Sequence, residues 1–159
     1  MSLTRWTLMS LLALTPATAL ASGGGPFGLG IIIGDPSGLS GKLKLDGTHA
    51  IDGALAFSAV DDVLYVHADY LFHAAPLRAQ GLSGHRFTPY VGIGGFIGVF
   101  DEGKKDRDTD SAVGARVPLG IAWEPPIPID VFLEVVPLMR IVPETDAGLD
   151  VGLGVRYFF

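Results

Sequence analysis

The chain has 159 residues, of which 48% are hydrophobic and 18% are charged, and its formal net charge is −6. This apolar, weakly charged composition excludes a disordered chain, and the acidic balance argues against a protein that binds nucleic-acid backbone. The chain has no cysteine, which excludes disulfides, thiolate zinc sites and a cysteine nucleophile. Its length predicts one domain.

Residues 1–21 have the layout of a secretory signal peptide. Arg5 precedes an apolar stretch, Pro16 interrupts it, and Ala19-Leu20-Ala21 forms a small-x-small cleavage signal. Too many polar residues interrupt this stretch for a transmembrane helix. We therefore expect export, followed by a flexible linker at 22–26 and a folded domain at 27–159.

From residue 27 onward, apolar residues alternate with polar or small ones, a pattern typical of strands between two different environments. The alternating segments, in chain order, are 27–33, 39–46, 51–58, 64–73, 90–99, 113–124, 129–135 and 149–159. Turn-forming residues separate them, and the longest connector is 74–86. The pattern predicts an all-β fold, specifically an eight-stranded antiparallel up-and-down transmembrane β-barrel.

The polar face of these segments carries few charges, and their signs nearly balance, as expected of a narrow barrel lumen. The expected polar network in the lumen consists of Lys42, Lys44, Asp52, His67, Asp69, Arg116, Glu134, Asp150 and Arg156. The same face carries Tyr65, Tyr90, Phe96 and Phe132. Such large side chains would fill an eight-stranded barrel and argue against a general porin.

Aromatic residues occur at strand ends, where a membrane interface would lie. With the N-terminus on the periplasmic side, Phe27, Phe72 and Trp123 form an expected periplasmic aromatic rim. The chain ends with Gly154, Tyr157 and Phe159 at the spacing of the C-terminal assembly signal of bacterial outer-membrane proteins, which this terminus resembles. That resemblance implies the barrel-assembly machinery as a partner during biogenesis.

Six segments carry a resemblance to a wider family. They are 34–42 (GDPSGLSGK), 50–53 (AIDG), 67–71 (HADYL), 92–95 (GIGG), 116–120 (RVPLG) and 130–137 (DVFLEVVP). Residues 28–159 resemble a family of small proteobacterial outer-membrane β-barrel proteins of the OmpA/OmpX type. The resemblance implies the barrel fold and the outer membrane of a Gram-negative bacterium, and it implies no particular activity.

Four residues invite a catalytic or metal-binding interpretation. His67, Asp69 and His73 share a strand face, and Ser58 is a candidate nucleophile for a His-Asp relay. Lumen positions would keep this group away from a lipid substrate, and the three strand residues spread over roughly 20 Å, too far for one metal ion. The charged stretch 101–110 lacks the glycine and glutamate of a calcium loop. We expect neither catalysis nor a cofactor.

The resulting hypothesis is a monomeric outer-membrane barrel with a structural or surface-interaction role, in contact with outer-membrane lipid and without nucleic-acid partners. Two alternatives stay open. One is an outer-membrane lipid-modifying enzyme, which would need a His-Ser-acid cluster on its lipid-facing side. The other is a soluble periplasmic lipocalin-like carrier of an apolar ligand, in which the apolar face would point inward.

Overall fold

The computed structural model describes residues 24–58, 63–78, 80–100 and 111–159. The expected signal peptide at 1–21 and the charged stretch at 101–110 lie outside these residues. Within the described part the secondary structure is all β, as the alternation predicts. No helix in these four ranges has the length and apolar character of a membrane span.

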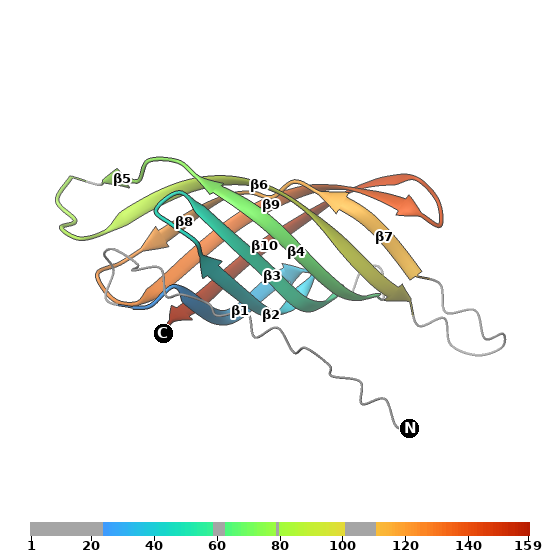
Figure 1. Cartoon of the computed structure of the whole chain (residues 1–159), viewed down its shortest axis with the longest axis horizontal. Coiled ribbons are helices and arrows are strands. Elements are labelled where there is room, and N and C mark those ends of the chain that lie inside the picture. Colours follow the sequence, from blue (N-terminus) through green and yellow to red (C-terminus); the bar gives the residue numbers. More distant parts are fainter. Residues whose placement is uncertain (1–23, 59–62, 79, 101–110) are drawn as a thin grey trace, which may run out of the picture.

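The strands form one antiparallel sheet that closes on itself into a ring (Figure 1). In chain order they are β1 (Phe27–Asp35), β2 (Ser37–Lys44), β3 (His49–Ser58), β4 (Val63–His73), β5 (Leu77–Arg78), β6 (Arg86–Phe100), β7 (Ser111–Arg116), β8 (Leu119–Glu124), β9 (Ile129–Val142) and β10 (Asp146–Phe158). Consecutive strands pair with each other, except that β4 pairs with β6, to which β5 also pairs, and that β7 and β8 both lie between β6 and β9. The pairing of β1 with β10 joins the first and the last described strands. The Phe159 backbone N–H donates to the Phe27 carbonyl over 2.9 Å.

The ring has two ends, which we name by the residues that mark them. The terminal rim carries the start of β1 at Phe27 and the end of β10 at Phe158, together with the ends of β2, β4 and β8. The distal rim carries the turns at Pro36 and at residues 143–145. Residues 24–26, in the expected linker, lie against the terminal rim, where the Pro26 carbonyl accepts a hydrogen bond from Lys44 N over 2.8 Å.

The segment predicted as one strand at 113–124 is divided into β7 and β8. Pro118 has no backbone N–H, so the ladder is interrupted there. Both halves still lie between β6 and β9, and the Pro118 carbonyl accepts from Gly92 N over 2.8 Å. The alternation of buried and exposed residues therefore continues through the break.

Three strand boundaries differ from the sequence expectation by three residues or more. Strand β9 continues to Val142 instead of ending near residue 135, and β10 begins at Asp146, so the hairpin between them is longer. Strand β6 begins at Arg86, and β5 pairs with its start. The connector expected at 74–86 is therefore partly sheet, because its few alternating residues pair with a strand already held in place.

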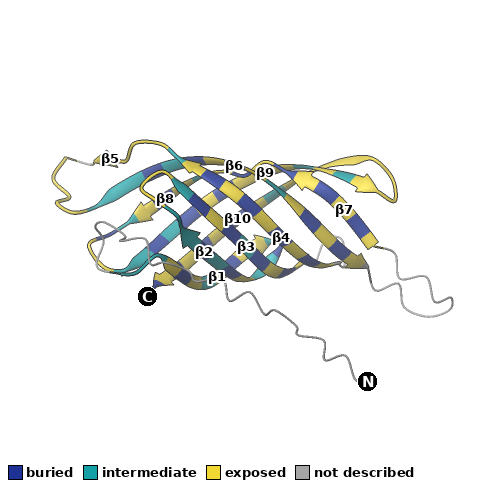
Figure 2. Cartoon of the chain, viewed as in Figure 1, coloured by how far each residue is buried: buried dark blue, intermediate teal, exposed yellow. Residues whose placement is uncertain are grey.

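Buried and exposed residues alternate along the strands, as the bands of Figure 2 show, and the two faces of the ring differ sharply in composition. The outer face presents large apolar side chains along every long strand, among them Leu29, Ile33, Leu55, Ile93, Leu133 and Leu153. Among the charged residues of the described strands, only the half-buried Asp35, the last residue of β1, shares the parity of this face. All the others lie on the inner face.

Candidate functional site: the charged interior

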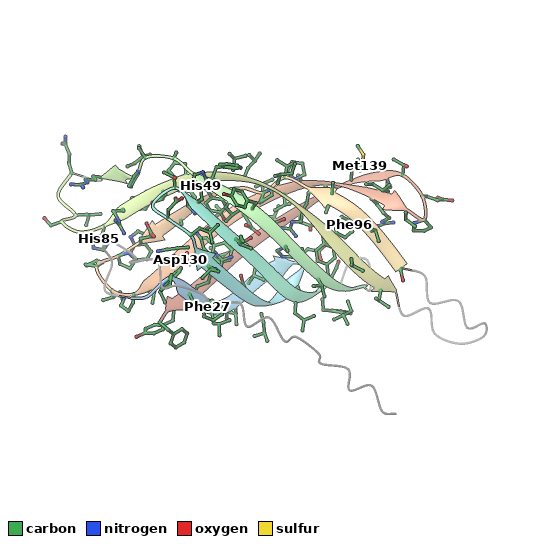
Figure 3. The ribbon with its side chains drawn as sticks, in the orientation of Figure 1. Phe27, His49, His85, Phe96, Asp130 and Met139 are labelled. Carbon is green, nitrogen blue, oxygen red and sulfur yellow. The ribbon has the colours of Figure 1, made fainter. Side chains whose placement is uncertain are left out.

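One cluster of buried charges, which we call the inner trio, consists of Lys42 from β2, Asp130 from β9 and Arg156 from β10. Asp130 Oδ2 lies 3.6 Å from Lys42 Nζ and 3.8 Å from Arg156 Nη1. Arg156 also contacts Asp52 Oδ2 through Nη2 at 2.8 Å and donates from Nε to Ser40 Oγ at 2.9 Å. Four strands, two from each end of the sequence, therefore meet at one buried ionic cluster. Figure 3 labels Asp130 inside the ring.

A second buried cluster is centred on Arg116 of β7. Its Nε lies 3.1 Å from Asp69 Oδ2, and its Nη2 lies 3.7 Å from Glu134 Oε1. His67 Nδ1 is also 3.1 Å from Asp69 Oδ2, and the Tyr90 hydroxyl donates to Glu134 Oε2 over 3.0 Å. Each buried ionic group thus has an oppositely charged or hydrogen-bonding neighbour, as low-dielectric burial requires.

A third contact lies toward the distal rim. The Tyr65 hydroxyl is 3.4 Å from Asp150 Oδ2, and the Tyr65 ring stacks on Phe96 with 4.8 Å between ring centroids. Asp150 is half-buried and has Tyr65, rather than a cation, as its hydrogen-bond partner in the described part of the chain. The aromatic pair fills the interior on this side.

At the terminal rim a more exposed cluster repeats the same chemistry, and we call it the rim trio: Lys44 from β2, Glu124 from β8 and Arg86 from β6. Glu124 Oε1 lies 3.0 Å from Lys44 Nζ, and Glu124 Oε2 lies 3.7 Å from Arg86 Nη2. Thr88 donates from Oγ1 to Glu124 Oε2 over 3.0 Å. The rim trio closes the interior at this end but stays in contact with water.

Interior aromatic rings lie over glycines of the neighbouring strand. Phe132 faces Gly154, Tyr90 faces Gly120, and Phe96 faces Gly114, and in each pair the two residues are register partners. A Cβ added to any of these glycines would collide with the ring of its partner. The glycines on the inner face therefore make room for bulky side chains, as a narrow closed sheet requires.

All nine residues expected in the polar network lie on the inner face, and eight of them fall into three groups. Lys42, Asp52 and Arg156 meet in the first, His67, Asp69, Arg116 and Glu134 in the second, and Lys44 joins the rim trio, whereas Asp150 lies apart with Tyr65. The expected network did not include Asp130, Glu124 and Ser40, although the alternation places all three on the same strand faces as its predicted members.

The structure separates the candidate catalytic residues. Ser58 pairs with Val63, whereas His67 pairs with Ala54, which lies four residues before Ser58 in β3. At about 3.3 Å per residue this places Ser58 roughly 13 Å from His67, beyond a hydrogen bond. Within the described ranges, no group of three His, Asp or Glu side chains is placed to hold a metal ion.

The expected rim aromatics lie together at the terminal rim, on the outer face. Phe27, Phe72 and Trp123 are exposed there, and Tyr157 and Phe159 lie edge to face with 5.1 Å between ring centroids. Trp123 Nε1 donates to His85 Nδ1 over 3.1 Å, which fixes its ring. Gly154 instead faces inward against Phe132, so it has a packing role of its own.

Comparison with known proteins adds no assignment. No protein-family model, no curated protein and no solved structure matches this chain.

Proposed function

We propose that this protein is an integral outer-membrane β-barrel with a plugged, charge-paired lumen, with a structural or surface-interaction role. Counting the interrupted β7 and β8 as one strand, and β5 as an addition to the edge of β6, gives eight strand positions around the ring. Eight is the strand number of the smallest outer-membrane barrels. Strands such as β4, with 11 residues, have the length needed to cross a bilayer at a tilt.

The observation that carries the proposal is the inversion of the usual arrangement of a soluble protein. Ionic side chains gather inside the ring, while the outer face presents leucine, isoleucine, valine and aromatic side chains. An exposed apolar surface much larger than a few hundred Å² is rare on soluble monomers and marks an interaction site. Surrounding lipid is the occupant that covers such a face on all sides of a ring.

The interior also argues for a plugged lumen and against the two alternatives. Phe132, Tyr90, Phe96 and Arg116 are buried inside, which favours neither a general porin nor a carrier with an apolar cavity. A lipid-modifying enzyme would need its His-Ser-acid cluster on the outer face, and the His67–Asp69 pair lies on the inner one. We therefore propose a non-enzymatic, monomeric barrel, whose assembly would use Gly154, Tyr157 and Phe159.

Fractionation combined with heat-modifiability tests the proposal. The protein should be recovered with the outer membrane and should migrate faster on a denaturing gel before boiling than after it. Leu153 lies on the outer face. If it is near the bilayer midplane, Leu153→Arg should destabilise the folded barrel in lipid by about 2–4 kcal/mol, whereas Leu153→Met should leave its stability nearly unchanged. Recovery as a soluble periplasmic protein would overturn the proposal.

Permeability tests the plugged lumen separately. Liposomes that contain the protein should not swell in isotonic solutions of small sugars, because aromatic and ionic side chains fill the interior. Rapid swelling would contradict the plugged lumen while leaving the barrel fold intact.

A further inference from the structure

Three strands lie side by side where the sheet continues past the end of β4 at the terminal rim (Figure 1). Strand β5 pairs with the start of β6 on one side, and β8 pairs with it on the other. The pairing places Arg78 directly opposite Arg86, and Arg86 directly opposite Glu124. The three side chains therefore form one row on the inner-face side of this extension.

The charges in this row do not balance. Like charges directly opposite each other on antiparallel strands are destabilising. Glu124 lies closer to Lys44 Nζ, at 3.0 Å, than to Arg86 Nη2, at 3.7 Å. Arg78 is exposed and forms no ion pair with another residue of the described ranges. Arg78 thus lies opposite a second arginine without a carboxylate of its own in the described residues, and an anion would relieve this concentration of positive charge.

The row is open to water, in contrast to the inner trio. The side chains of Lys44 and Arg86 are 25% and 26% exposed, whereas those of Lys42 and Arg156 are 2% exposed. An anion can therefore approach this row without the cost of entering the interior. Guanidinium groups present a planar fork of donors that matches the oxygens of phosphate, and a lysine adds a mobile positive charge.

We propose that Arg78, Arg86 and Lys44 form a binding site for a phosphate group at the terminal rim. Glu124, with Thr88, holds Lys44 and Arg86 beside each other and is a positioning residue. The site rests on the geometry of the rim, independently of the membrane.

Two sources could supply this phosphate. The opposite face of the same three strands carries Leu77, Phe87 and Trp123 as register partners. The arginines are therefore adjacent in the sequence to apolar residues at the rim, the level at which lipid headgroups would lie in the proposed barrel. Free phosphate would instead arrive from the aqueous mouth. The lipid source rests on the proposed function, whereas the free-phosphate source does not.

Isothermal titration calorimetry of the full chain in an uncharged detergent tests the site. Only protein that migrates as the fast, folded band without boiling is titrated. Absence of a binding heat therefore counts against the phosphate site and not against the barrel. Inorganic phosphate at constant ionic strength should bind saturably, and Arg78→Gln should weaken binding at least about tenfold because it removes charge-assisted hydrogen bonds. Arg78→Lys, which keeps the charge but loses the planar fork of donors, should bind more tightly than Arg78→Gln and more weakly than the unchanged protein.

Arg140→Gln, the same chemical change on β9 near the distal rim, is the matched control and should leave binding unchanged. A parallel titration compares a short-chain phosphatidic acid with the diacylglycerol that lacks its phosphate. Binding of free phosphate assigns a soluble source, and binding of phosphatidic acid alone assigns a lipid headgroup. Absence of both, or an equal loss in Arg78→Gln and Arg140→Gln, would overturn the proposal.

Discussion

Two trios with the same kinds of charged group, a lysine, a carboxylate and an arginine, lie at two depths of the ring. In the inner trio, Lys42, Asp130 and Arg156 are 2%, 0% and 2% exposed; in the rim trio, Lys44, Glu124 and Arg86 are 25%, 13% and 26% exposed. The rim trio has the shortest of the four contacts, at 3.0 Å. Distance alone therefore does not set how much an ion pair contributes to stability, because burial decides how much stability is lost when one partner is removed.

The largest expected effect follows from removing the carboxylate of the inner trio. Asp130→Ala removes the carboxylate nearest to Lys42 and leaves this buried ammonium beside Arg156, which keeps its contact with Asp52. The change should destabilise the fold by about 3–5 kcal/mol. Glu124→Ala is the matched change in the rim trio and should cost about 1 kcal/mol or less, because water and salt solvate the cations left behind. Urea unfolding, followed by loss of the fast-migrating band, measures both. Equal losses of stability in the two variants would contradict the importance of burial.

Packing against the inner trio provides a second, smaller test. The guanidinium of Arg156 lies 3.8 Å from the centroid of the Phe132 ring, which in turn occupies the space over Gly154. Gly154→Ala should displace this ring and cost about 1–3 kcal/mol, a typical penalty for overpacking. The additional change Phe132→Leu should recover part of the loss.

Gly41→Ala is the control for this test. Gly41 lies on the outer face, and the side-chain atom nearest to an added Cβ is Leu29 Cδ2, at 3.6 Å, an ordinary van der Waals distance. The same urea titration should show little change. A loss equal to that of Gly154→Ala would mean that strand propensity, and not the aromatic ring, sets the cost.

The two trios should also differ in how salt changes their contribution to stability. Lys44→Met should cost about 0.5–1 kcal/mol at low ionic strength, as exposed pairs do. That cost should nearly disappear at about 1 M salt, where the screening length falls to roughly 3 Å. Lys42→Met should keep its cost at both salt concentrations, because salt does not screen buried charges well. The same salt dependence in both variants would contradict the prediction that burial protects the inner trio from screening.

The smallest effect is expected at an exposed turn of the terminal rim, outside both trios. The Thr48 backbone N–H, with further hydrogen bonds from the His49 side chain, lowers the pKa of Asp46 well below its ordinary value. Because the folded-state pKa is lowered, the stabilisation is full above the ordinary pKa of aspartic acid and is lost as the pH falls below it. Asp46→Asn should speed amide exchange at Thr48 near neutral pH and have little effect in acid. Unchanged exchange at neutral pH would contradict this role for Asp46.

The sequence was sufficient to predict the antiparallel all-β architecture and which residues share the inner face, because one strand residue in two points inward. It could not predict which inner residues meet. Arg156 and Ser40 are 116 residues apart, and their contact depends on the register across the closure of the ring. The alternation placed Asp130 on the inner face but could not predict its contacts with Lys42 on β2 and Arg156 on β10 for the same reason. The strand β5 escaped notice because two residues carry no recognisable period.

The pairing of β1 with β10 has a consequence for how the molecule reaches its native state. Strand β1 can complete its hydrogen bonds only with β10, so the ring cannot close until β10 has been synthesised. Contacts with such long separation have high entropic cost and slow folding. The inner trio, which joins β2, β9 and β10, forms only at that step. The chain therefore gains its buried ionic pairs in the same event that hides its last unpaired sheet edges.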